Sequence, residues 1–174
     1  MTLLGSSTLP FLDHGVTQVA WVVDDLDQAV QAQHRLFGVG PWHYYRYDRS
    51  MLSMMRRNGK DTEFVLDTAV ANAGPTRFEI VQPLQGDTIY HEFVREHGYG
   101  RIHHFGLAVD NMAESLELVR RAGIAVTMEG SGYGLDGDGH FAYLDTEKTF
   151  GVILELMERP RRRRQPWKVF PAQE

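Results

Sequence analysis

The sequence predicts an α+β protein built from two modules that share one order of elements: a strand, a helix and three strands. A segment that begins at Gln18 is similar to a segment that begins at His104. Each is a short apolar run followed by an aspartate and an amphipathic stretch, which is the pattern of a strand that leads into a helix. The two halves also end alike, because Glu79 and Glu155 each interrupt a short apolar run. We therefore expect an internal repeat.

The first module is expected over residues 14–85. Its first strand begins at Gln18, and the pair Asp25 and Gln28 has the spacing of a capping box at a helix start. Gly38 is suited to end this helix, because glycine readily adopts the left-handed conformation found there. Three further strands are predicted from apolar and aromatic runs at about 42–48, 62–68 and 77–83.

The second module is expected over residues 100–159, after a linker helix at 86–99 that Asp87 can cap. In this module the pair Asn111 and Glu114 repeats the capping box of the first. The strands that follow its helix are predicted at about 125–129, 140–145 and 153–159.

The composition is that of an ordinary globular chain and excludes several classes of function. With 174 residues, 43% of them hydrophobic, the chain is long enough to bury a core. Its net charge of −5 gives no general attraction to nucleic acid, and the lack of cysteine excludes disulfides, thiolate metal sites and cysteine nucleophiles. No apolar run reaches the ~18 residues of a membrane span, and the N-terminus lacks the features of a signal peptide. We expect a cytoplasmic protein.

Three segments have distinctive compositions. Residues 41–55 are rich in aromatic side chains and methionine, which could form an adaptable apolar wall for a substrate or simply pack in the core. Residues 130–139 are rich in glycine and are expected to form a flexible loop beside the mouth of a cavity. Residues 160–174 form a basic C-terminal tail, which we expect to be solvated or poorly ordered, with a patch that binds a partner as the alternative.

Four polar residues occupy matching places in the two halves. Side chains alternate across a strand, so Gln18 and His104 each share a strand face with small residues. Glu79 and Glu155 lie within apolar strands, where a carboxylate is costly to bury unless it is paired, protonated or bound to a metal. A pseudo-twofold axis between the modules would bring all four side chains together. The alternative is that both glutamates face solvent and that His104 is a buried structural histidine.

These four residues predict a metal site. One imidazole nitrogen and three oxygens form a hard, mixed donor set that suits a Zn, Co, Ni, Mn or Mg ion. We therefore expect Gln18, Glu79, His104 and Glu155 to bind one divalent metal ion. Open positions on that ion could polarise the carbonyl group of a substrate.

The stretches GRIHHFGLAVDNM (100–112) and FAYLDTEKTFGVILELMERP (141–160) resemble the vicinal oxygen chelate superfamily, which includes glyoxalase I, methylmalonyl-CoA epimerase and extradiol dioxygenases. The resemblance is greatest to the epimerase and glyoxalase-like branch and implies a cupped sheet around a divalent metal. It implies the same four ligands. Gln18 stands where the epimerases have histidine, and Glu79 stands where some have glutamine. The ligand order along the chain, Gln, Glu, His and Glu, is similar to that of animal-type glyoxalase I. The histidine missing at position 18 argues against extradiol dioxygenase chemistry.

The resemblance implies an isomerase, epimerase or lyase that transfers a proton next to the carbonyl of a bulky small molecule, such as an acyl-CoA thioester. It assigns Glu63 and Glu155 as the acid–base residues, and Glu155 doubles as a metal ligand. His140 is the alternative proton carrier, and Glu63 could instead be an ordinary surface glutamate. The alternative function is that of a non-catalytic binding protein, like the antibiotic-sequestering members of the family. We also expect a homodimer.

Overall fold

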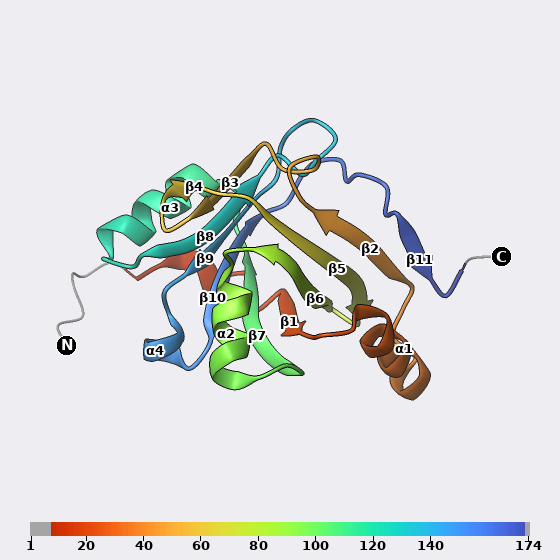
Figure 1. The fold of residues 1–174 in the computed structure, drawn as a ribbon. Helices are drawn as coiled ribbons and strands as arrows, with labels where there is room; N and C mark the ends of the chain where they lie inside the picture. The colour runs from red at the N-terminus through yellow and green to blue at the C-terminus, as the bar shows by residue number, and fades with distance from the viewer. Residues whose placement is uncertain (1–7, 173–174) are drawn as a thin grey trace.

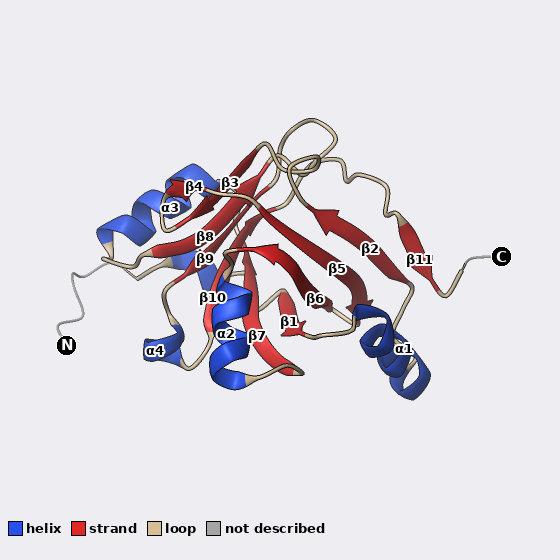
Figure 2. Cartoon of the chain, viewed as in Figure 1, coloured by secondary structure: helices blue, strands red, loops and turns tan. Residues whose placement is uncertain are grey.

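The computed structural model describes residues 8–172 and shows one strongly curled sheet with helices packed against it (Figures 1 and 2). The predicted α+β class is confirmed. The helices are α1 (Leu26–Phe37), α2 (Ile89–His97), α3 (Met112–Arg121) and α4 (Glu147–Phe150), preceded by a 3-10 turn at Pro10–Leu12. The strands are β1 (Gln18–Val22), β2 (Trp42–Tyr47), β3 (Met54–Arg57), β4 (Lys60–Asp61), β5 (Phe64–Ala73), β6 (Thr76–Gly86), β7 (Arg101–Ala108), β8 (Val126–Ser131), β9 (His140–Leu144), β10 (Ile153–Glu158) and β11 (Lys168–Phe170).

The two halves of the sheet meet along β1 and β7, which pair antiparallel at its centre. On one side β1 pairs parallel with β6, and on the other side β7 pairs parallel with β10. The two parallel pairs have the same register, because Ala20 lies opposite Glu79 and Gly106 lies opposite Glu155. Ala20 and Gly106 are related by the same offset as the two halves of the sequence repeat. The repeat in the sequence is therefore also a repeat of strand register.

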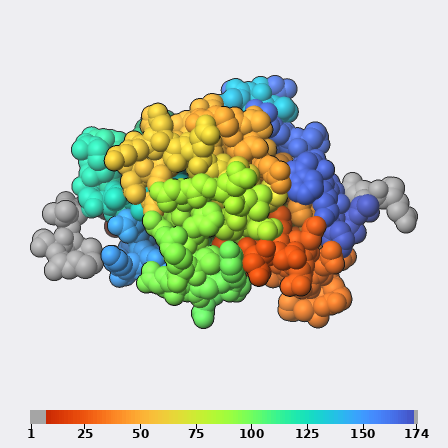
Figure 3. All heavy atoms as spheres, viewed as in Figure 1, coloured from red at the N-terminus to blue at the C-terminus, as the bar shows by residue number. Residues whose placement is uncertain are grey.

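Each half of the sheet ends in strands from the other half of the chain. The β3–β4 hairpin follows β2 in the sequence, yet β3 pairs with β8, where Met55 lies opposite Gly130. The tail contributes β11, which pairs antiparallel with β2, where Val169 lies opposite His43. Figure 3 shows this C-terminal segment, in blue, beside orange segments from the first part of the chain. The expectation of a solvated or poorly ordered tail is therefore wrong for Lys168–Phe170.

Helices α1, α2 and α3 each begin at a side chain that accepts a hydrogen bond from the first turn. Asp25 accepts from the backbone N–H of Gln28 at the start of α1, and Asn111 accepts from that of Glu114 at the start of α3. Both predicted helix starts are thus present, each through the hydrogen bond that its N-cap side chain accepts. The linker helix α2 is also present, but its cap is Thr88 rather than Asp87. Within residues 8–172, no helix has the length and apolar character needed to cross a membrane.

Three clusters of buried side chains stabilise this arrangement. Val30 of α1 and Trp42 belong to a cluster against the first half of the sheet. Val119 of α3 and Leu107 belong to the matching cluster in the second half. The third cluster joins α2, through Phe93, to strands of both halves. Because α1 and α3 lie at opposite ends of the molecule (Figure 1), the inner side of the curled sheet is left to α2 and to a cavity.

Replacement of Asn111 by alanine should destabilise the protein by about 1 kcal/mol, because the N–H of Glu114 would lose its acceptor. Urea unfolding followed by circular dichroism measures this change. Asn111→Asp is the matched control, since aspartate accepts the same hydrogen bond and should leave the free energy of unfolding nearly unchanged. Equal stability of Asn111→Ala and the wild type would contradict the role of this cap.

Candidate metal centre

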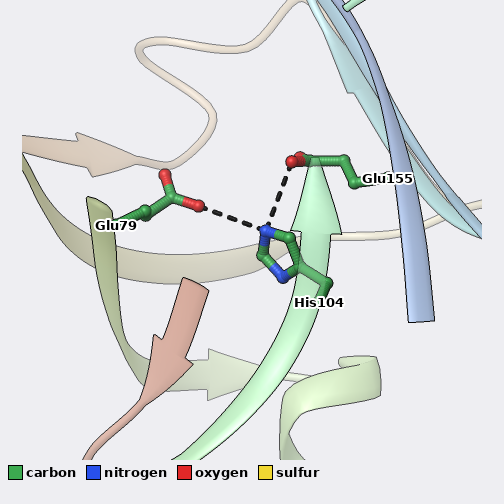
Figure 4. Close-up of side chains that lie close together, drawn as sticks. All are labelled: Glu79, His104 and Glu155. Atoms are coloured by element: carbon green, nitrogen blue, oxygen red, sulfur yellow. Dashed lines mark ion pairs between the residues drawn. The ribbon is translucent and has the colours of Figure 1, made fainter. Parts of the chain in front are cut away.

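The four predicted ligands come together at the centre of the sheet, one on each of four adjacent strands. Nε2 of His104 on β7 lies 3.4 Å from Oε2 of Glu79 on β6 and 3.2 Å from Oε2 of Glu155 on β10. Figure 4 shows the two glutamates approaching the same ring nitrogen of His104. Nε2 of Gln18 on β1 donates hydrogen bonds of 3.0 Å to each Oε2 atom. The structure thus brings all four residues together, and their role as metal ligands stays a prediction.

Gly106 allows the side chains to approach this closely. It lies opposite Gln18 on one side of β7 and opposite Glu155 on the other. A Cβ atom at this position would lie 2.8 Å from Cβ of Gln18 and 3.3 Å from Oε2 of Glu155. Any residue larger than glycine would therefore push these two side chains apart.

The spacing of the four side-chain atoms fits a divalent ion. Ligand atoms bonded at about 2.0–2.2 Å to one ion lie about 3.0–3.5 Å from one another in tetrahedral or adjacent octahedral positions. Nε2 of Gln18 lies 3.5 Å from Nε2 of His104, and the other measured spacings in the cluster are 3.0–3.4 Å. A half-turn of the Gln18 amide would present its carbonyl oxygen, which is the atom a metal prefers. Glu79, His104 and Glu155 alone could already hold an ion.

The electrostatics of the cluster favour a positive charge at its centre. The side chain of His104 is fully buried, and those of Glu155 and Glu79 are 4% and 10% exposed. Burial alone would lower the pKa of His104, but the charges and hydrogen bonds of Glu155 and Glu79 outweigh burial and raise that pKa to about 9. Without a metal, one imidazolium therefore faces two carboxylates away from water. A dication in place of the proton would balance both carboxylates.

His103 orients the imidazole of His104 from the other side. The Nδ1 atoms of the two rings are 2.9 Å apart, so one of them donates a hydrogen bond and the other accepts it. Burial, and then the positive charge of His104, lower the pKa of His103 well below its usual range. His103 is thus the neutral acceptor, and Nδ1–H of His104 is the donor. This hydrogen bond leaves Nε2 of His104 directed at the two glutamates.

The cluster borders a cavity with a largely aromatic wall. Gln18, Glu79 and Glu155 line it together with Tyr45, Tyr47, Met51, Tyr133, Phe141 and Tyr143. Residues 41–55 were expected either to form an apolar wall or to pack in the core, and they do both. Tyr45, Tyr47 and Met51 line the cavity, whereas Trp42, Tyr44 and Met55 are buried in the core. The contribution of Tyr133 places the glycine-rich loop beside the cavity.

The two residues expected to carry a proton beside Glu155 do not line this cavity. The side chain of Glu63 is 76% exposed and pairs with Arg49, while Leu66 and Thr68 of β5 line the cavity. His140 lies 3.0 Å from Glu129, while the neighbouring side chains of β9 line the cavity. Because side chains alternate along a strand, His140 points to the face opposite Phe141 and Tyr143. Glu63 directly precedes β5, and its side chain extends into solvent beside Arg49. Neither side chain lines the cavity in this arrangement, and the proton-transfer role of either residue stays a prediction.

Two tyrosines of the cavity were missed by the sequence analysis. The hydroxyl groups of Tyr90 on α2 and Tyr143 on β9 lie 2.6 Å apart and next to the metal-ligand cluster. Burial, and then the negative charges of Glu79 and Glu155, raise the pKa of Tyr90 well above its usual range. The hydroxyl therefore stays protonated and able to donate. Both tyrosines occupy ordinary apolar positions of their elements, so the sequence carries no signal that singles them out.

Residues 17–143 match the family model described as the Glyoxalase/Bleomycin resistance protein/Dioxygenase superfamily. The chain belongs to this superfamily, which confirms the resemblance noted in the sequence.

Solved structures with the same fold include methylmalonyl-CoA epimerases. The enzyme from Mycobacterium tuberculosis has a TM-score of 0.60 at 19% identity, over 82% of this chain and 85% of that one. A variant of the Streptomyces coelicolor enzyme in complex with 2-nitronate-propionyl-CoA has a TM-score of 0.61 at 16% identity, over 82% and 95%. At these identities the likeness establishes the fold alone.

One curated protein is similar to this chain in sequence. The uncharacterised protein YqjC of Bacillus subtilis is 26% identical over 93 residues, which are 53% of this chain. The match spans 65% of the length of YqjC.

The metal-free protein should lose stability as the pH rises from about 6.5 to about 9. The pKa of His104 is raised from its ordinary value of 6.5 to about 9 on folding, so the folded state keeps a proton that the unfolded state gives up. At about 1.4 kcal/mol per pKa unit, the loss should reach at most roughly 3 kcal/mol. Urea titrations of EDTA-treated protein at pH 6.5 and pH 9 measure it. The loss should be absent in His104→Gln, and an equal loss in that variant would assign it to another group.

Proposed function

We propose that this protein is a divalent-metal-dependent isomerase, epimerase or lyase that moves a proton at the carbon next to a carbonyl group. The observation that supports this most strongly is the convergence of Gln18, Glu79, His104 and Glu155 beside an aromatic cavity. Membership of the superfamily and the likeness of the fold to methylmalonyl-CoA epimerases agree with it.

The substrate would be a bulky carbonyl compound. Tyr45, Tyr47 and Phe141 offer apolar faces on which the body of such a molecule can pack. Acyl-CoA thioesters are the first class to test, because one neighbouring epimerase binds 2-nitronate-propionyl-CoA and another binds methylmalonyl-CoA.

Gln18, Glu79, His104 and Glu155 would hold the ion. A divalent ion in this place supplies a Lewis acid that polarises a carbonyl oxygen and so makes the neighbouring C–H more acidic. Glu79 and Glu155 are the two carboxylates that line the cavity within residues 8–172. Glu155 would take the proton from the carbon, and Glu79, from the other half of the sheet, is placed to return a proton from a different direction. A second proton carrier is what epimerisation requires.

The purified protein should carry about one divalent ion per chain, measured by metal analysis of protein that has not met a chelator. Glu155→Ala and His104→Ala should each lose most of the ion, because each removes a donor atom. Glu63→Ala is the matched control, since it removes an exposed carboxylate and should keep the metal. Metal content that is unchanged in Glu155→Ala would contradict the proposed ligand set.

In D2O, the enzyme should place deuterium at the α-carbon of a substrate. The panel would contain methylmalonyl-CoA, other 2-substituted acyl-CoA thioesters and bulky ketones, each followed by proton NMR. Glu155→Gln should slow exchange at least ~100-fold, because glutamine can remain a ligand, as Gln18 would be, but cannot take up a proton. Metal analysis of the same sample separates loss of the base from loss of the ion.

Two outcomes would change this assignment. Exchange that is lost in Glu63→Gln as well as in Glu155→Gln would restore the pair of acid–base residues implied by the family resemblance. Tight binding of panel compounds with no exchange in any of them would favour the alternative function, a protein that binds or sequesters a small molecule without reaction.

A further inference from the structure

The proposed reaction leaves one charged feature of the cavity without a role. Four arginines line the same cavity as the metal-ligand cluster: Arg77, Arg159, Arg163 and Arg164. Arg77, Arg159 and Arg163 also line an adjoining hollow beside β2 and β5.

The topology of the sheet brings two of these arginines to one end of the cavity. Arg77 precedes Glu79 by two residues on β6, and Arg159 follows Glu155 by four residues after β10. β6 is parallel to β1, β1 is antiparallel to β7, and β7 is parallel to β10. β6 and β10 therefore run in opposite directions, so the start of β6 and the end of β10 lie at the same end. At about 3.3 Å per residue, Arg77 and Arg159 lie about 7 and 13 Å along their strands from the metal ligands.

The tail adds the other two arginines. It follows β10 and runs past the glycine-rich loop toward β11 (Figure 1). Arg161 and Arg162 form ion pairs with Asp138 and Asp136 of that loop, and the backbone of Arg163 forms a bridge with Gly134. With the tail fixed in this way, the next two side chains, Arg163 and Arg164, line the cavity.

These four arginines differ from Arg161 and Arg162 because they lack counter-charges. Within residues 8–172, none of them forms an ion pair with a carboxylate, whereas Arg161 and Arg162 both do. Nε of Arg164 is buried without a hydrogen-bond partner in that part of the chain. Arg163 is still exposed at the mouth of the cavity, and its partial desolvation, followed by the positive charge of Arg77, lowers its pKa. A group of like charges held together in this way attracts an anion.

We propose that this arginine cluster binds an oxyanion of the substrate, a carboxylate or a phosphoryl group, while the carbonyl end of the substrate faces the metal ligands. The proposal rests on the proposed function, since it takes the cavity as the substrate site. Guanidinium groups suit this role because their paired N–H donors match the oxygens of both anions. The substrate is then an anionic carbonyl compound whose charged group lies roughly 7–13 Å from the carbonyl, with an apolar or aromatic middle beside Tyr45, Tyr47 and Tyr133.

Small aromatic anions test the cluster without knowledge of the substrate. Phenyl phosphate and benzoate would be titrated by calorimetry into EDTA-treated protein, so that no ion in the metal centre can bind the anion. Benzyl alcohol is the uncharged probe. We expect at least one anion to bind the wild type, and its affinity to fall at least tenfold in the double variant Arg77→Met, Arg163→Met. Arg120→Met is the matched control, because Arg120 is an exposed arginine paired with Glu117, and it should bind as the wild type does.

Each outcome decides the proposal. The anion that binds more tightly assigns a carboxylate or a phosphoryl group. Equal affinity in the wild type and the double variant overturns the proposal, as does the absence of anion binding or equal binding of benzyl alcohol. If the double variant fails to fold, the single variants Arg77→Met and Arg163→Met replace it, each expected to weaken binding at least threefold. Metal analysis of protein that has not met a chelator keeps the two proposals apart. If that protein carries no metal but the treated protein still binds the anion, only the metal centre is contradicted.

Discussion

The antiparallel pairing of β1 with β7 is the constraint on which the rest of the structure depends. It joins two parallel strand pairs that have the same register, so that one polar side chain from each of four neighbouring strands faces the same point. A slip of one residue in this pairing would turn a whole set of side chains to the other face of the sheet. Gly106 lies at the centre of this arrangement and leaves room for Gln18 and Glu155 to approach His104.

The sequence predicted the parts of the fold and the site that the internal repeat duplicates. Gln18 and His104 stood out because each breaks the same apolar pattern, and the structure brings both into one cluster. The helix starts at Asp25 and Asn111 could be predicted because a capping box is a local signal. The cap of α2 was misplaced by one residue, from Thr88 to Asp87, because both residue types accept the same hydrogen bond.

The remainder depends on contacts between distant parts of the chain. β3 and β4 are short and mostly charged, and β3 forms as a strand because β8 offers it a partner. β11 lies in a tail whose composition suggests solvent exposure, and its partner β2 is more than 120 residues earlier in the chain. The family resemblance placed Glu63 at the site, but the side chains of β5 that line the cavity begin at Leu66. No local pattern determines which face of a two-sided strand meets a cavity.

The strand β11 also bears on how the protein reaches this fold during synthesis. An unpaired edge strand exposes backbone groups that can pair with another chain. β2 is made early, whereas the strand that covers its edge is made more than 120 residues later. Until those residues are available, the growing chain carries an open edge next to its first completed helix. The C-terminal segment therefore covers the edge of β2 as well as supplying arginines to the cavity, and a chain that ends before it would leave the longer edge of β2 open to pairing with its own copies.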